Sequence, residues 1–101
     1  MTTEKKDQTC PAENLLKLLA GKWKPQIFRL SIEGPLRFNA LVRQLEGSNK
    51  QAVATAIREL EQQGILDKQV IQEKPLHIEY TLTEKGRSFI PVFEQLEALG
   101  N

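Results

Sequence analysis

The 101-residue sequence predicts one mostly helical α+β domain, on the strength of three observations. Apolar residues recur at helical spacing in four consecutive segments of the first two thirds of the chain. A pair of short strand-like segments follows, and one more apolar helix closes the sequence. The length suits one domain, and a composition of 40% apolar and 27% charged residues is typical of a soluble globular protein and too apolar for a disordered chain.

The start of the domain is predicted from where the helical pattern of apolar residues begins. Residues 1–9 are polar and unpatterned, so we expect a flexible tail there and a single domain over residues 10–101. A first helix is expected from Pro11 to about Gly21, because proline suits a first helical turn. No stretch reaches the roughly 20 apolar residues of a membrane span, and the start lacks the apolar core of a secretory signal. A cytoplasmic protein with no membrane partner is therefore expected.

The central helices are separated by glycine-containing breaks. A second helix is expected from Trp23–Pro25 to the Gly34-Pro35 breaker, and a third ends at Gly47. The third has its apolar residues at offsets 0, 3, 4 and 7, which places them on one face: Phe38, Leu41, Val42 and Leu45.

The fourth helix is expected to open at Ser48 or Asn49, since either side chain can accept a hydrogen bond from a free amide of the first turn. It continues to about Gln63, before Gly64. A narrow apolar stripe of Val53, Ile57 and Leu60 is expected to face inward.

The pattern changes after Ile65 to that of a hairpin. Strands are expected at 66–73 and 77–82, joined by a Lys74-Pro75-Leu76 turn, with Ile78, Tyr80 and Leu82 alternating inward. Thr83 can cap a final helix over about 83–99, in which Pro91 removes one hydrogen bond and predicts a kink or break.

Two helices joined by a tight turn and followed directly by a hairpin are typical of a winged helix-turn-helix. The helix-turn-helix would cover about residues 36–63 and the hairpin wing about 66–82, with the terminal helices left for dimerisation. In such a fold the second helix enters the DNA major groove, so double-stranded DNA is the expected partner. Residues 35–58 carry four positive charges against one negative, a modest basic footprint of the kind DNA binding needs.

The candidate DNA-binding residues lie on the polar face and start of the fourth helix, ahead of the third helix, and in the wing. Asn49 fits a helix cap better than a base reader, and Arg58 could instead pair with Glu61. The set is Arg37, Ser48, Asn49, Lys50, Gln51, Ala54, Thr55, Arg58, Lys74 and His77.

Several separated motifs resemble one known family. They are CP at 10–11, GKW at 21–23, GPLRFNALVRQLEG at 34–47, IRELEQQG at 57–64 and EYTLTEKGRSFIPVF at 79–93. Together they are similar to the HxlR-type regulators, a MarR-like group of dimeric winged-helix transcription factors. The resemblance implies a homodimer held by its terminal helices on a two-fold-related operator, with repression the usual outcome.

Some positions depart from that family's pattern. Ser48-Asn49 and Gln51 replace an Ile-Ser and a lysine common at the start of the recognition helix, so base preference is not carried over. In the wing, Pro75-Leu76-His77 replaces Pro-Pro-Arg or Pro-Pro-Lys, which removes a fixed positive charge.

Apolar residues of the terminal segments exceed what so small a core can cover, which independently predicts a homodimer. Trp23 fits a core or dimer-core position, because aromatic residues bury large areas. The candidate interface residues are Leu15, Leu19, Trp23, Phe89, Phe93 and Leu96.

Cys10 is the single cysteine and precedes the predicted first helix, where free amides and the helix dipole can lower a thiol pKa. Two interpretations stand side by side: a redox sensor that a small electrophile or oxidant modifies, and a residue that only packs or caps. The resemblance adds weight to the first, since this cysteine is the sensing residue in several relatives. One His and one Cys, 67 positions apart, do not make a metal site of usual spacing, and no cofactor is expected.

No phosphate loop or nucleophile elbow is present in the sequence, so we expect no enzyme. The alternative to a DNA-binding regulator is a winged helix that serves as a protein–protein interaction module.

Overall fold

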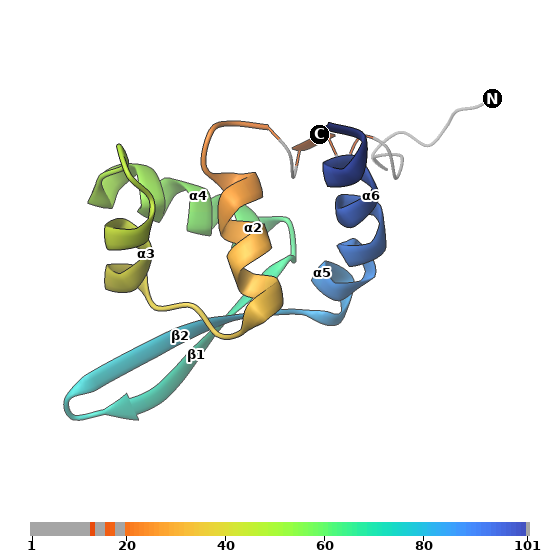
Figure 1. Ribbon diagram of the computed structural model, residues 1–101. Coiled ribbons are helices and arrows are strands. Elements are labelled where there is room, and N and C mark those ends of the chain that lie inside the picture. The colour runs from red at the N-terminus through yellow and green to blue at the C-terminus, as the bar shows by residue number, and fades with distance from the viewer. Residues whose placement is uncertain (1–12, 14–15, 18–19, 101) are drawn as a thin grey trace.

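The computed structural model describes residues 13, 16–17 and 20–100. Within them the chain forms helices and one hairpin in the predicted order (Figure 1). The elements are α2 (Lys24–Glu33), α3 (Phe38–Gln44), α4 (Lys50–Gln62), β1 (Leu66–Glu73), β2 (Leu76–Leu82), α5 (Glu84–Ser88) and α6 (Ile90–Gly100). Within the first predicted helix, Glu13, Leu16 and Lys17 are helical, whereas Ala20 and Gly21 at its expected end are not; its other residues lie outside the described ranges. None of the helices in these ranges is long and apolar enough to cross a membrane.

The helices begin and end where local chemistry dictates. Pro25 occupies the first turn of α2, where its missing N–H is not needed. Asn49 caps α4, because its Oδ1 accepts a hydrogen bond from the Ala52 N–H at 2.8 Å. Gly47, with φ of 86°, provides the left-handed backbone of the turn between α3 and α4.

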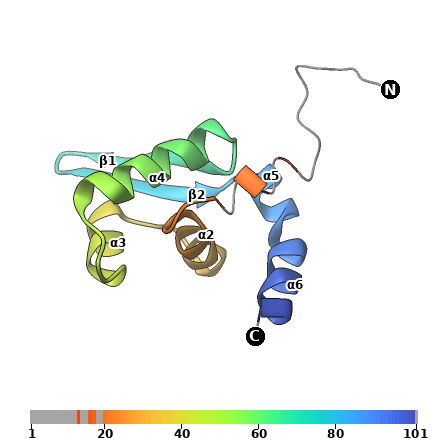
Figure 2. The same cartoon turned by 90° about the horizontal axis from the view of Figure 1, so that it is seen from above.

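The core lies between the three central helices and the base of the hairpin. The deepest side chains come from α2, α3, α4 and the segment entering β1: Ile27, Phe28, Leu41, Val53, Leu60 and Ile65. The Phe28 ring meets Phe93 of α6 edge to face, with ring centroids 4.8 Å apart. Figures 1 and 2 show α2 between α3 on one side and α6 on the other, so α2 joins the two halves of the domain.

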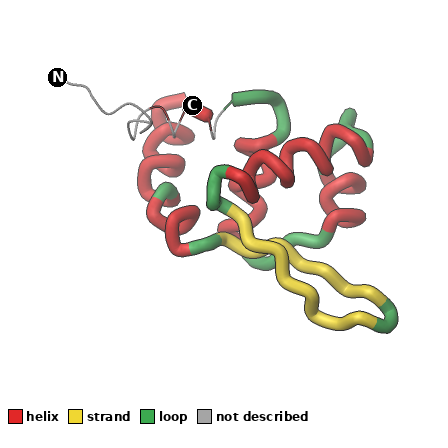
Figure 3. Tube along the Cα trace, turned by 180° about the vertical axis from the view of Figure 1, so that it is seen from behind, coloured by secondary structure: helices red, strands yellow, loops and turns green. Residues whose placement is uncertain are grey.

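The hairpin is longer and less buried than the sequence suggested. Leu76 pairs with Glu73, so the connection is only Lys74-Pro75, and the strand predicted from His77 begins one residue earlier. Of the three residues predicted to face inward only Leu82 is fully buried; Ile78 and Tyr80 are half-buried. The reason is visible in Figure 3, where the hairpin extends beyond the helices that could cover it.

A backbone bridge attaches the hairpin to the helix-turn-helix. The Leu36 N–H donates to the Tyr80 carbonyl at 2.8 Å, and the Tyr80 N–H donates to the Leu36 carbonyl at 2.9 Å. Burial raises the pKa of the Tyr80 phenol above its ordinary value, and the nearby Glu61 carboxylate raises it further. The phenol, packed against the core, therefore stays neutral to a higher pH than the phenol of an exposed tyrosine.

The final helix is interrupted as Pro91 predicts. Thr83 caps α5, since its Oγ1 accepts from the Gly86 N–H at 2.9 Å. The helix then breaks at Phe89, and α6 begins with Ile90 and Pro91, which places the proline in a first turn where it is tolerated. The break confirms the interruption expected near Pro91.

Gly86 lies where α5 presses against the entry to the wing. A Cβ added there would be 2.6 Å from the Ile65 carbonyl oxygen and 2.8 Å from Leu82 Cδ2. We expect Gly86→Ala to lower the free energy of unfolding by about 1–3 kcal/mol, because backbone must shift to relieve the overlap. Urea unfolding measures the change. Gly100→Ala, which meets no atom within 4 Å, is the matched control; equal midpoints for the two variants would contradict the packing described.

Candidate nucleic-acid interface

The outer face of α4 is polar and accessible. Lys50, Gln51, Thr55 and Arg58 are exposed, and Ala54 between them is half-buried. The opposite face is buried as predicted, with Val53 and Leu60 fully covered and Ile57 3% exposed. This division leaves the helix held by the core on one side and open to a partner on the other.

The cations of this face are not occupied by neighbouring carboxylates. Within the described ranges neither the Lys50 nor the Arg58 side chain makes an ion pair or a hydrogen bond, so the alternative pairing of Arg58 with Glu61 is not formed. Glu59 is engaged elsewhere: its Oε1 lies 3.1 Å from Lys24 Nζ. Lys24 is itself buried and also donates to the Lys17 carbonyl at 2.7 Å.

The two residues before α4 shape the turn. Asn49 is committed to the cap, as the sequence indicated. The Ser48 hydroxyl donates to the Leu45 carbonyl at 2.5 Å and is half-buried. Both side chains therefore fix the start of α4, and Lys50 and Gln51 are the first residues there with free polar ends.

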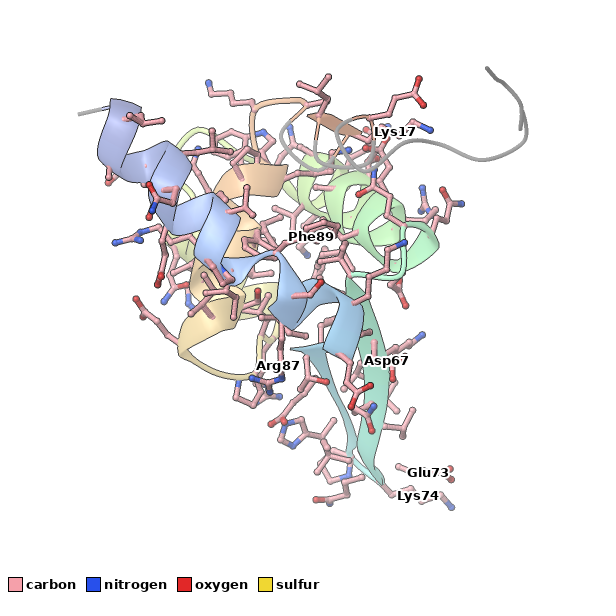
Figure 4. The ribbon with its side chains drawn as sticks, turned by 90° about the vertical axis from the view of Figure 1, so that its right-hand side faces the viewer. Lys17, Asp67, Glu73, Lys74, Arg87 and Phe89 are labelled. Atoms are coloured by element: carbon pink, nitrogen blue, oxygen red, sulfur yellow. The ribbon has the colours of Figure 1, made fainter. Side chains whose placement is uncertain are left out.

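The wing carries no net positive charge, because Lys68 and Lys74 are outnumbered by the carboxylates Asp67, Glu73 and Glu79. Lys74 is exposed at the tip beside Glu73 (Figure 4). His77 is half-buried, with its Nε2 3.0 Å from Glu79 Oε2, so a carboxylate offsets any charge the imidazole gains. Of the two wing candidates, only Lys74 is a free cation in this structure.

The residues predicted for the dimer interface differ in how far they are exposed in the single chain. Leu15 and Leu19 lie outside the described residues, as does Cys10. The interface role predicted for Phe93 stays a prediction; within its own chain the side chain is 4% exposed and packs on Phe28. Phe89 is half-buried on the side of the domain shown in Figure 4, and Trp23 is half-buried with Lys22 Nζ 5.0 Å from its ring centroid.

The open apolar surface of α6 includes Leu96, one of the residues predicted for the interface. Leu96 is 37% exposed, Val92 41% and Leu99 80%. Val92 was not among the predicted interface residues, although offsets of 0, 4 and 7 place Val92, Leu96 and Leu99 on one face of the helix. Only the packing of α6 on α2 decides which face of α6 is covered.

No group of three or more His, Cys, Asp or Glu side chains suited to a metal ion occurs in the part of the chain that the structure describes. The polar surface of α4 thus stands as the principal candidate site, with its chemistry limited to hydrogen bonds and charge.

Solved structures with the same architecture define the class of protein. The redox regulator HypR in its reduced form superposes with a TM-score of 0.82 at 35% identity, covering 90% of both chains. The reduced transcriptional regulator YodB from B. subtilis gives 0.78 at 34% identity, again over 90% of both chains. HypR has also been solved oxidised, and YodB after diamide treatment and with quinone bound. The fold is that of a winged helix-turn-helix transcriptional regulator.

The family is shown by sequence as well. Residues 18–101 match the HxlR-like helix-turn-helix family, and the chain belongs to it. YybR of Bacillus subtilis (strain 168), an uncharacterized HTH-type transcriptional regulator, is 36% identical over 91 residues, which are 90% of this chain and 73% of YybR. These findings confirm the fold and family predicted from the sequence.

Proposed function

We propose that this chain binds a two-fold-related operator as a homodimer and represses transcription, with α4 as the recognition helix. The observation that supports this most directly is the outer face of α4, whose cations have no partner within the described residues. A helix is about 10 to 12 Å across with its side chains and fits the major groove of DNA, which is about 12 Å wide.

Roles for individual residues follow from their positions on α4. Lys50 and Gln51, in the first turn, reach a base edge or a phosphate most easily. Thr55 and Arg58 follow along the same exposed face, where arginine can bond two acceptors of one guanine. Arg37 and Lys74 are candidates for phosphate, whereas Ser48, Asn49 and Ala54 mainly set the backbone that approaches DNA.

Replacing cations on α4 tests the recognition helix. We expect Lys50→Ala and Arg58→Ala each to weaken operator binding by about 1–3 kcal/mol, because each removes a contact with DNA. Both variants should stay folded, because neither side chain contributes to the core. Gel shifts on genomic fragments at two salt concentrations measure binding, with circular dichroism to verify folding. Arg87→Ala on α5 is the charge-matched control.

The same assay separates the DNA-binding function from a protein interaction module. A DNA reader shifts particular fragments and loses affinity as salt rises, since counterions released from phosphate drive binding. A parent protein that shifts none at low salt would favour the protein module, and unaltered affinity of both variants would refute the placement of α4. Transcription in vitro from a shifted promoter then tests repression.

The exposed apolar residues of α6 support dimerisation. Figure 1 shows α6 on the opposite side of α2 from α3, where a partner can cover it without obstructing α4. We expect light scattering to give a dimer at micromolar concentration and Leu99→Glu to shift it toward monomer, because a buried unpaired charge is costly. Ile71→Glu, at an exposed apolar residue of β1, is the control. A monomeric parent would contradict the proposal.

Cys10 is proposed as the residue through which an oxidant or electrophile releases DNA. The solved forms of HypR and YodB support this by kinship. Diamide accepts two electrons and two protons as two thiols form one disulfide, so the product is a Cys10–Cys10 bridge between subunits or a mixed disulfide with a small thiol. A quinone instead forms a carbon–sulfur bond to the thiolate, and a proton from water completes the hydroquinone adduct.

We expect diamide and quinone to reduce DNA binding by the parent and to leave Cys10→Ser unaffected. Titrating each reagent into the gel shift, with mass spectrometry of the modified peptide, measures both effects. Equal responses of the two proteins, or no response of the parent, would make Cys10 a structural residue.

A further inference from the structure

A groove of about 340 Å³ lies between α3 and the second strand of the wing. One wall comes from α3 and the residue before it, with Arg37, Asn39 and Arg43; the other comes from β2, with Leu76 and Ile78. Phe38 and Ala40 also line the α3 side, so that side combines two guanidinium groups with apolar surface, whereas the β2 side is apolar.

The cationic wall has no counter-charge of its own. Arg37 and Arg43 are both exposed, no carboxylate lines the groove, and neither arginine forms an ion pair within the ranges described. Arg37 is the N-cap residue of α3, but its side chain makes no capping hydrogen bond, so the guanidinium can bind a ligand. Such a pair of unneutralised guanidinium groups attracts an anion.

The apolar wall is open to the same space. Leu76 is 64% exposed although it belongs to a paired strand, and Ile78 beside it is half-buried. An occupant that bonds both walls must present negative charge on one side and apolar surface on the other.

We propose that this groove seats one sugar-phosphate strand of the bound DNA, with phosphates on Arg37 and Arg43 and deoxyribose rings against Leu76 and Ile78. The inference rests on the proposed DNA-binding function and adds a backbone site that includes three residues outside the recognition helix and not predicted from sequence: Arg43, Leu76 and Ile78.

The position of the groove favours DNA over an acidic protein segment. Figures 1 and 3 show α3 at the end of the domain where α4 begins and the hairpin extends. If α4 occupies a major groove and the wing approaches the adjacent minor groove, the strand that divides these grooves crosses the surface between them. Arg37 and Arg43 are six residues apart, about 9 Å along a helix axis, so they reach different phosphates of a strand whose charges rise 3.4 Å apart.

Salt dependence of binding tests the cationic wall. We expect Arg43→Ala to reduce the slope of log K against log salt by about 0.9, and the Arg37→Ala Arg43→Ala pair to reduce it by about twice that, on cognate and unrelated duplexes alike. Arg87→Ala, with the same loss of charge on α5, should keep the parent slope.

The apolar wall makes a different prediction. Leu76→Ser should weaken binding several-fold without changing the slope, because it removes contact with sugar and no charge. Methylphosphonate substitution at single linkages of the operator then locates the strand: a neutral linkage in the groove should weaken the parent and leave the double-arginine variant unchanged.

The outcomes separate the two proposals. If the parent binds DNA but Arg43→Ala and the double variant keep its slope, the backbone site is refuted and the proposed function stands. If the variants keep the parent's DNA binding but lose binding of an acidic peptide, the groove binds a protein segment; the backbone site is then refuted and the proposed function stands. If the folded parent binds no duplex, the proposed function fails and the backbone site fails with it.

Discussion

The paired hydrogen bonds between Leu36 and Tyr80 are the constraint on which the arrangement of the surface depends. They fix the middle of β2 to the segment that leads into α3, at 2.8 and 2.9 Å, and so hold the wing to the helix-turn-helix. An isolated two-stranded hairpin is marginally stable in water. The bridge gives this hairpin a third backbone partner, which aligns its outer half with α3 and creates the groove between them.

Helix α2 contacts both α4 and α6 and so fixes their positions relative to each other. Its Lys24 joins the described N-terminal segment to α4 through the Lys17 carbonyl and the Glu59 carboxylate. Its Arg29 makes two bonds to the carboxylate of Glu97 on α6, at 2.9 and 3.1 Å. A buried ammonium needs such partners, because an unpaired charge is expensive to take out of water. Helices α4 and α6 are thus both held in position by contacts with α2.

Helix α6 has one face packed in the core and another that is exposed. Phe93 points inward to Phe28 and contributes to the fold of a single chain, whereas Leu96 and Leu99 remain on the outside. In the proposed dimer the second surface would be covered by a partner without removing any residue from the core. This separation explains why Leu99→Glu can test association while the subunit stays folded.

The sequence by itself determined the order of elements, the cap at Asn49, the break near Pro91 and the inward stripe of α4. These depend on local spacing and on the conformations that proline, glycine and capping side chains allow. Tertiary structure decided the burial of Phe93, the pairing of Leu76, the engagement of His77 by Glu79, and the meeting of Arg43 with the wing. Each of these four features depends on contacts between elements that are distant in the sequence. Periodicity along one helix or strand says which residues share a face, but only packing says what that face meets.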